Sequence, residues 1–180
     1  NPNMKTILLV GGSLGARTIN ESMLQHLDLV GQSDVQFIWQ TGKVYYEAIK
    51  ERLQNEELPN LKATDFISDM GAAYKAADLV ISRAGASSIS EFCLIGKPVI
   101  LVPSPNVAED HQTKNAMALV NRNAAVYVKD SEAVDVLLKT ALHTVGDAKK
   151  LESLKENILK LGLKNSADVI ADEVIKLAIK

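Results

Sequence analysis

The chain has 180 residues, of which 47% are hydrophobic and only 10 are Gly and 5 are Pro. It is therefore long enough to bury a core, its composition is not that of a disordered chain, and we expect a single domain over residues 1–180. Its 20 Lys and Arg against 22 Asp and Glu give a formal net charge of −2, and without a basic block this balance argues against nucleic acid as a partner.

Short apolar runs alternate along the chain with longer segments of helical periodicity. Strands are expected at Lys5–Val10, Val35–Thr41, Leu61–Phe66, Leu79–Ser82, Pro98–Val102 and Ala124–Val128. Helices are expected at Gly15–Leu29, Val44–Gln54, Met70–Ala76, Ser87–Ile95, Gln112–Asn121, Glu132–Thr144, Lys149–Leu161 and Ser166–Ile179. This alternation predicts an α/β fold, a doubly wound Rossmann-like parallel sheet of about six strands. The last three helices have no strand between them and are expected to pack outside the sheet.

The first strand leads into a glycine-rich turn that opens a helix, Gly11–Arg17. Such a turn presents backbone N–H groups and a helix dipole to a diphosphate. Gly11 and Gly12 permit a tight turn and a close approach of the backbone, Gly15 and Ala16 let the helix start close to the sheet, and the Ser13 hydroxyl can bind a phosphate oxygen. The alternative for Ser13 is an ordinary helix N-cap.

The spacing of this turn is not that of a dinucleotide fingerprint. A G-x-G-x-x-G register that starts at Gly11 places Ser13 where the second glycine belongs. The second strand ends in Gln40-Thr41 rather than in an acid that binds a ribose. NAD is therefore disfavoured, and the lysine of a P-loop is absent as well.

The fourth strand leads into a second turn of small residues, Ser82–Ala86, which starts the helix expected over Ser87–Ile95, and Glu91 lies one turn into that helix. A carboxylate at this place can accept hydrogen bonds from both hydroxyls of a ribose whose phosphates lie on a neighbouring helix end. The alternative is a capping box formed by Ser88 and Glu91. Arg83, in the same turn, has a surface ion pair as its alternative role.

The fifth strand is followed by a loop with Pro103 and Pro105 and then by a helix that begins near Gln112. His111 and Gln112 are expected in the first turn of that helix, at the same edge of the sheet, where polar side chains suit the recognition of sugar hydroxyls. His111 is also a candidate general base, although no orienting partner is evident in the sequence.

The remaining histidines and the cysteine are expected to be structural. His26 and His143 fall on outer helices, whereas Trp39 and Cys93 fall on buried faces. A single cysteine forms no internal disulfide, and residues 1–5 lack the apolar core of a signal peptide, so we expect a reducing, cytoplasmic location. No stretch reaches the roughly 20 apolar residues of a membrane span, so any membrane contact is expected to be peripheral.

Taken together, these loops resemble the sugar-nucleotide-binding half of the MurG family of GT-B glycosyltransferases. The resemblance covers nearly the whole chain and rests on motifs in the same order: Gly11–Ala16, Phe66–Met70, Ala73-Tyr74, Ala77-Asp78, Ser82–Ala86, Ser90-Glu91 and Glu109–Ala116. Enzymes of that family transfer N-acetylglucosamine from UDP-N-acetylglucosamine to undecaprenyl-diphosphate-linked muramyl pentapeptide with inversion. This step makes lipid II for peptidoglycan, and hence for cell wall, cell shape and cell division, at the cytoplasmic face of the bacterial inner membrane.

The resemblance also implies roles for individual residues. Ser13 contacts the diphosphate, the backbone at Ile67 reads the uracil edge, Glu91 holds the ribose, and Gln112 binds sugar hydroxyls with help from His111. The donor-binding residues that it implies are Gly12, Ser13, Gly15, Phe66, Ile67, Met70, Arg83, Gly85, Ala86, Ser87, Ser88, Glu91, His111 and Gln112.

The family also has an N-terminal domain that binds the lipid-linked acceptor and is expected to carry the catalytic base. No segment of this sequence resembles that domain, so we expect a C-terminal half that is inactive when isolated and has no catalytic residue unless His111 is one. The sequence has no Asp-x-Asp pair for a diphosphate-bound metal. Helix dipoles and backbone amides are therefore expected to stabilise the leaving UDP without a metal or cofactor.

Three alternatives stay open at this point. One is a stand-alone donor subunit of a dolichol-linked N-acetylglucosamine transferase, whose other half is a separate membrane protein. Another is a UDP-N-acetylglucosamine 2-epimerase, although the catalytic acids and second domain that it requires are not evident. The third is a non-catalytic module that binds a nucleotide sugar.

Overall fold

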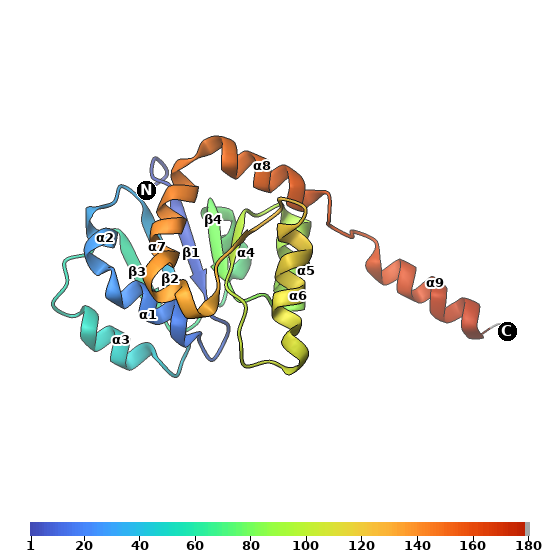
Figure 1. Ribbon diagram of the computed structural model, residues 1–180, viewed down its shortest axis with the longest axis horizontal. Helices are drawn as coiled ribbons and strands as arrows, with labels where there is room; N and C mark the ends of the chain where they lie inside the picture. The colour runs from blue at the N-terminus through green and yellow to red at the C-terminus, as the bar shows by residue number, and fades with distance from the viewer. Residues whose placement is uncertain (179–180) are drawn as a thin grey trace.

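The computed structural model describes residues 1–178, which form a parallel sheet covered by helices (Figure 1). The six strands are β1 (Thr6–Val10), β2 (Gln36–Gln40), β3 (Leu61–Thr64), β4 (Leu79–Ser82), β5 (Val99–Leu101) and β6 (Val126–Tyr127). Their order in the sheet is β3-β2-β1-β4-β5-β6, and every neighbouring pair is parallel. The predicted doubly wound α/β fold is confirmed, and each strand lies within its predicted range.

Helices follow the strands in the predicted alternation. They are α1 (Arg17–Gln25), α2 (Leu27–Gln32), α3 (Tyr46–Leu53), α4 (Met70–Ala76), α5 (Ala86–Ile95), α6 (His111–Val120), α7 (Asp130–Gly146), α8 (Ala148–Leu159) and α9 (Ser166–Ala178). A short 3₁₀ helix, η1 (Ala108–Asp110), precedes α6. The predicted end of the last helix, at residue 179, lies outside the described residues.

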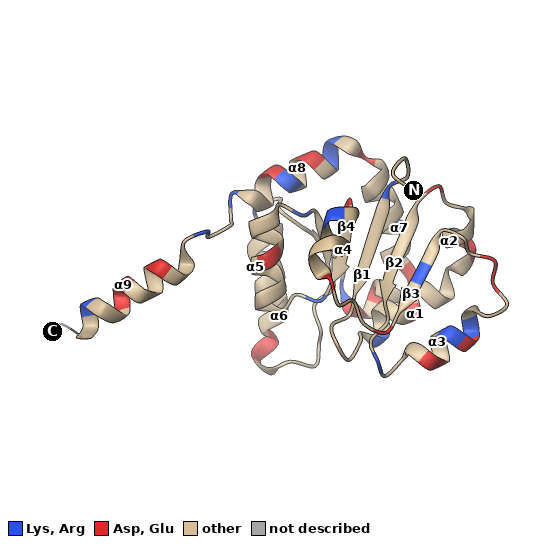
Figure 2. Ribbon diagram, turned by 180° about the vertical axis from the view of Figure 1, so that it is seen from behind, with Lys and Arg blue, Asp and Glu red and all other residues tan. Residues whose placement is uncertain are grey.

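Two apolar layers cover the two faces of the sheet, because successive side chains of a strand point to opposite sides. Ile7 and Leu9 of β1 belong to the layer formed with α1 and α7, and Leu8 belongs to the layer formed with α4, α5, α6 and α8. Figure 1 shows α1 and α7 in front of the sheet, and Figure 2 shows α4 and α5 in front when the molecule is seen from behind. Burial on both faces explains why the central strands are continuously apolar.

The helix predicted over Gly15–Leu29 is wrong in one respect, because the helix breaks at His26. The His26 ring nitrogen Nδ1 lies 3.0 Å from the Ser22 carbonyl oxygen, and the His26 N–H donates to the Met23 carbonyl instead. The expectation that His26 lies on an outer helix surface is also wrong, since only 9% of the residue is exposed.

The three consecutive helices at the C-terminal end differ in their packing. α7 is part of the layer on the sheet, with Leu137 and Leu138 buried against β-strand side chains, so the expectation that it packs outside is wrong. α8 buries Leu154 and Ile158. α9 buries no residue and projects away from the rest of the molecule (Figure 1). None of the helices in the described part of the chain is both long and apolar enough to cross a membrane.

The strand order reverses between β1 and β4, the two central strands. Ligands of doubly wound folds bind at such a reversal, beyond the carboxyl ends of the strands. Because all six strands are parallel, they end at this edge, and the loops that follow β1, β3, β4 and β5 carry the residues singled out in the sequence.

Candidate functional site

The glycine-rich turn after β1 has a backbone that side chains rarely tolerate. Gly12 and Gly15 have φ of 82° and 86°. A Cβ on Gly15 would lie 2.2 Å from the Thr41 carbonyl oxygen, because the turn packs against the loop that follows β2. The Gln40 side chain also donates to the Gly12 carbonyl oxygen at 3.0 Å. The end of β2 therefore fixes the shape of this turn, a role of Gln40 that the sequence did not reveal.

Ser13 is not the N-cap of the helix that follows. The N-cap of α1 is Ala16, which provides no side-chain hydrogen bond. Ser13 is exposed at the tip of the turn, three residues earlier. The structural alternative for Ser13 is thus wrong, and its contact with a phosphate stays a prediction.

The capping box expected from Ser88 and Glu91 is also absent. The N-cap of α5 is Gly85, so Ser88 is the third residue of the helix rather than its cap. The exposed Glu91 carboxylate accepts a hydrogen bond from the Tyr74 hydroxyl on α4, with 3.1 Å between the oxygens. Glu91 therefore lies on the surface between α4 and α5 and is not used to cap its own helix.

Tyr74 itself is held by packing. Its ring meets the ring of Phe92 edge to face, with 5.7 Å between the centroids and 83° between the planes. Burial, followed by the hydrogen bond to Glu91 and the charge of that carboxylate, raises the pKa of Tyr74 well above its usual value. The phenol therefore remains protonated and remains a donor at every ordinary pH.

The start of α6 is joined to the loops after β4 and β5 by Gln112. Its side-chain oxygen accepts from the backbone N–H of Ala84 at 3.2 Å and of Ser104 at 2.9 Å. The amide nitrogen of Gln112 remains available to a ligand. His111 Nδ1 contacts the Ala108 carbonyl oxygen at 2.8 Å, within its own turn, and the residue is exposed. No acid orients the His111 ring among the described residues.

Arg83 is occupied by partners within the protein. Its guanidinium forms an ion pair with Asp130, the first residue of α7, and donates to the carbonyl oxygens of Val102 at 3.1 Å and Pro103 at 3.3 Å. Both charged side chains are less than 20% exposed. This pair fastens α7 to two of the loops at the site, and contact of Arg83 with a ligand stays a prediction.

Two cavities at the carboxyl edge are lined by some of the candidate residues. One, of about 600 Å³, has Gly11, Gly15, Arg83 and Gln112 among the residues that line it. The other, of about 380 Å³ beside β3, is lined in part by Phe66 and Ile67. The remaining candidates lie outside both linings: Gly12, Ser13, Met70, Gly85, Ala86, Ser87, Ser88, Glu91 and His111. The candidates thus form an extended surface rather than one closed pocket.

The helices α1, α5 and α6, which follow the loops after β1, β4 and β5, begin at this surface without a side-chain cap, and α3 and α7 also lack one. By contrast, α4 is capped by Asp69 and α8 by Asp147. The first N–H groups of an α-helix have no carbonyl acceptor within the helix, and the helix dipole adds partial positive charge there. Free N–H groups at neighbouring helix starts suit an anion such as a diphosphate.

In residues 1–178, no group of three or more His, Cys, Asp or Glu side chains is placed to hold a metal ion. Two acidic side chains at the site, Glu91 and Asp130, are bound to Tyr74 and Arg83 respectively.

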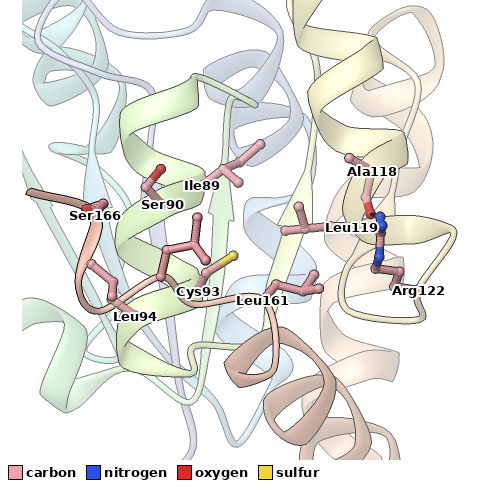
Figure 3. Close-up of a pocket in the computed structure, with 10 residues that line it drawn as sticks. Ile89, Ser90, Cys93, Leu94, Ala118, Leu119, Arg122, Leu161 and Ser166 are labelled. Atoms are coloured by element: carbon pink, nitrogen blue, oxygen red, sulfur yellow. Dashed lines mark hydrogen bonds between the residues drawn. The ribbon is translucent and has the colours of Figure 1, made fainter. Parts of the chain in front are cut away.

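A separate cavity of about 310 Å³ lies between α5 and α6, away from the carboxyl edge (Figure 3). Its lining is mostly apolar and includes Cys93, Leu119 and Leu161, with Arg122 at one side. Burial raises the pKa of the Cys93 thiol. The prediction that Cys93 and Trp39 are core residues is confirmed, since they are 5% and 0% exposed.

Comparison with known proteins gives a consistent result. The model of the glycosyltransferase family 28 C-terminal domain matches residues 6–173. A Bacteroides fragilis protein named UDP-N-acetylglucosamine–N-acetylmuramyl-(pentapeptide) pyrophosphoryl-undecaprenol N-acetylglucosamine transferase is 66% identical over 180 residues, which are 99% of this chain and 47% of that protein. A Parabacteroides distasonis protein of the same name is 57% identical and is covered over 49% of its length. The chain thus spans about half the length of the curated relatives it matches.

Among solved structures, the crystal structure of MurG from Acinetobacter baumannii matches with a TM-score of 0.82 and 30% sequence identity. The match covers 97% of this chain and 50% of that structure. The match therefore extends over nearly the whole of this chain.

Proposed function

The chain belongs to the glycosyltransferase family 28 through its C-terminal domain, and on this premise we propose that it binds the nucleotide-sugar donor of a MurG-type transferase. The donor in this proposal is UDP-N-acetylglucosamine, which the names of the curated relatives include. The acceptor is the undecaprenyl-diphosphate-linked muramyl pentapeptide, and the product is the lipid-linked disaccharide used for peptidoglycan.

The observation that carries the proposal is that α1, α5 and α6, which follow neighbouring strands of the sheet, begin without side-chain caps at its carboxyl edge. Their N–H groups can take up the charge that develops on UDP as the bond between the anomeric carbon and the phosphate oxygen breaks. In this proposal no metal or cofactor is needed. Glu91 receives the ribose hydroxyls, the loop at Ile67 receives the uracil, and the free amide nitrogen of Gln112 receives the sugar.

The acceptor side is assigned to the half of the curated relatives that this chain does not cover. That half would hold the acceptor hydroxyl close to the anomeric carbon and accept its proton, because positioning of both reactants contributes much of the rate of such a displacement. The full-length enzyme would work at the cytoplasmic face of the bacterial membrane through peripheral contact, where a lipid-linked acceptor is accessible.

Calorimetric titration with UDP and with UDP-N-acetylglucosamine, each with and without a chelator, tests the donor site. Both ligands are expected to bind, with the same Kd in the presence of chelator. A strict requirement for a divalent ion would refute the metal-free mechanism, and the absence of binding by either ligand would refute the donor site itself.

Transfer to a lipid-linked acceptor distinguishes a transferase half from a non-catalytic sensor. The 180-residue chain alone is expected to give no transfer, and addition of the residues that a close relative has upstream of the matched region is expected to give activity. Binding of UDP-N-acetylglucosamine without transfer in both preparations would favour the sensor. Transfer by the chain alone, lost in His111→Ala, would make His111 the base.

A further inference from the structure

A hydrogen bond joins two helices beside the candidate donor site. The Tyr74 hydroxyl on α4 donates to Oε2 of Glu91 on α5, 17 residues later in the chain. α4 follows the loop that carries Phe66 and Ile67, whereas α5 follows the small-residue turn after β4. The bond therefore lies between the part of the site assigned to the base and the part assigned to the phosphates.

The two partners differ in how firmly they are held. Tyr74 is half-buried, and its ring is fixed edge to face against Phe92, which is 1% exposed. Glu91 is exposed and, among the hydrogen bonds of the described residues, has no partner other than Tyr74. A glutamate on a helix surface otherwise loses much side-chain entropy when a ligand fixes it in one rotamer. The tyrosine is the fixed member of this pair, and it restricts the glutamate.

The chemistry of the pair leaves the carboxylate free for a diol. An ionised carboxylate accepts at two oxygens with about four lone-pair directions, and the phenol uses one direction on Oε2. Oε1 and the second lone pair of Oε2 remain for two hydroxyl donors. Because Tyr74 stays protonated at ordinary pH, it remains a donor to Glu91 throughout the pH range of a binding experiment.

We propose that Tyr74 is a positioning residue that holds the Glu91 carboxylate toward the two ribose hydroxyls of the nucleotide. The inference rests on the proposed function, because it requires a ribose at Glu91. It adds that recognition of the ribose depends on two helices, α4 and α5, and that Tyr74 acts on affinity without touching the ligand.

The test compares UDP with 2′,3′-dideoxy-UDP in calorimetric titrations. Tyr74→Phe removes only the hydroxyl and keeps the ring on Phe92. This variant is expected to raise the Kd of UDP about three- to tenfold, because the ligand must then restrict a freer Glu91 side chain, and to leave the Kd for dideoxy-UDP unchanged. In a Glu91→Ala background, Tyr74→Phe is expected to have no further effect on UDP. Tyr46→Phe on α3 is the matched control, since no hydrogen bond of its hydroxyl is found in the described structure.

The outcomes separate this inference from the proposed function. If the wild-type chain binds neither nucleotide, or if Glu91→Ala lowers the affinity for both nucleotides equally, the proposed ribose site is refuted. If Glu91→Ala lowers the affinity for UDP but not for dideoxy-UDP, and Tyr74→Phe changes neither affinity, the ribose site stands and the positioning role is refuted. If Tyr74→Phe lowers the affinity for both nucleotides equally, Tyr74 has a general structural role, and the inference is overturned.

Discussion

The indole nitrogen of Trp39 donates to the side-chain oxygen of Asn20 at 2.9 Å, in the buried layer between β2 and α1. The amide nitrogen of Asn20 in turn donates to the Thr41 carbonyl oxygen at 2.9 Å. Thr41 lies against Gly15, so this buried amide connects the core to the underside of the glycine-rich turn.

Replacement of Asn20 by Ala is expected to be strongly destabilising. It leaves the Trp39 N–H and the Thr41 carbonyl without partners in the interior, which should lower the free energy of unfolding by about 2–4 kcal/mol. Denaturant titration measures the change. Asn121→Ala at the exposed end of α6 is the control and should change the free energy by less than about 0.5 kcal/mol. Equal, small effects of both variants would contradict the role of Asn20.

Three glycine-to-alanine variants should distinguish the energetic cost of backbone strain from the cost of steric overlap. Gly146→Ala meets open space at an ordinary φ and should be neutral or slightly stabilising. Gly12→Ala meets open space at a φ of 82° and should cost about 1–2 kcal/mol. Gly15→Ala adds an overlap with the Thr41 carbonyl to the same strain and should cost about 3 kcal/mol or more.

The order of these three free energies of unfolding is the result to be checked. Gly15→Ala should also lower the affinity for UDP, because the turn must move away from Thr41. A Gly15→Ala protein as stable as Gly12→Ala would show that the two loops separate easily.

Glu91→Ala should reduce affinity without reducing stability. The carboxylate is exposed and does not cap α5, so the melting temperature should change little. Loss of a charged hydrogen bond to the ribose should make the binding free energy of UDP less favourable by about 1.5–3 kcal/mol. Thermal unfolding and titration of the same preparation provide both numbers. An unchanged Kd with a lowered melting temperature would return Glu91 to a structural role.

Gln112→Ala is expected to affect both properties. It leaves the N–H groups of Ala84 and Ser104 without their acceptor, which should cost about 1–3 kcal/mol of stability. It also removes the amide nitrogen, so the affinity for UDP-N-acetylglucosamine should fall more than the affinity for UDP. His111→Ala should show the same selectivity, more weakly, without loss of stability. Gln32→Ala on α2 is the control, and parallel weakening of both ligands by Gln112→Ala would remove this helix start from the sugar site.

Cys93 should react slowly with iodoacetamide in the folded chain. Burial raises its pKa, so at pH 8 the fraction of the reactive thiolate is lower than for a free cysteine. We expect a rate at least about tenfold below that in urea, with a rise that continues above the ordinary thiol pKa of about 8.5. Mass spectrometry follows the modification. A native rate equal to the unfolded rate would show that the cavity between α5 and α6 opens freely.

The fold was predictable because its signal is local. The central strands β1, β4 and β5 are short apolar runs, and β4 matches its predicted range, Leu79–Ser82, at both ends. The break at His26 was not predictable, because it depends on a ring nitrogen that contacts a carbonyl one turn away. The packing of α7 on the sheet was missed for a similar reason, since its burial depends on α1, more than a hundred residues earlier.

The candidate site was predictable in its parts but not in its connections. The motif Ser88-x-x-Glu91 resembles a capping box only if the helix begins at Ser88, and the sequence pattern does not fix the first residue of a helix to that accuracy. The partners of Gln112 and Tyr74 lie on other loops and helices. Pairs of this kind follow from the topology, which local spacing does not encode.

The position of α7 has a consequence for how the chain folds during synthesis. Thr18 of α1 donates to Asp130 of α7 across 112 residues of sequence. Until the ribosome has made α7, the apolar side of β1 and α1 has no cover, and transiently exposed apolar surface promotes aggregation. A nascent chain that ends before Asp130 should therefore bind chaperones, whereas one that extends beyond Gly146 should become protected from protease in a single late step.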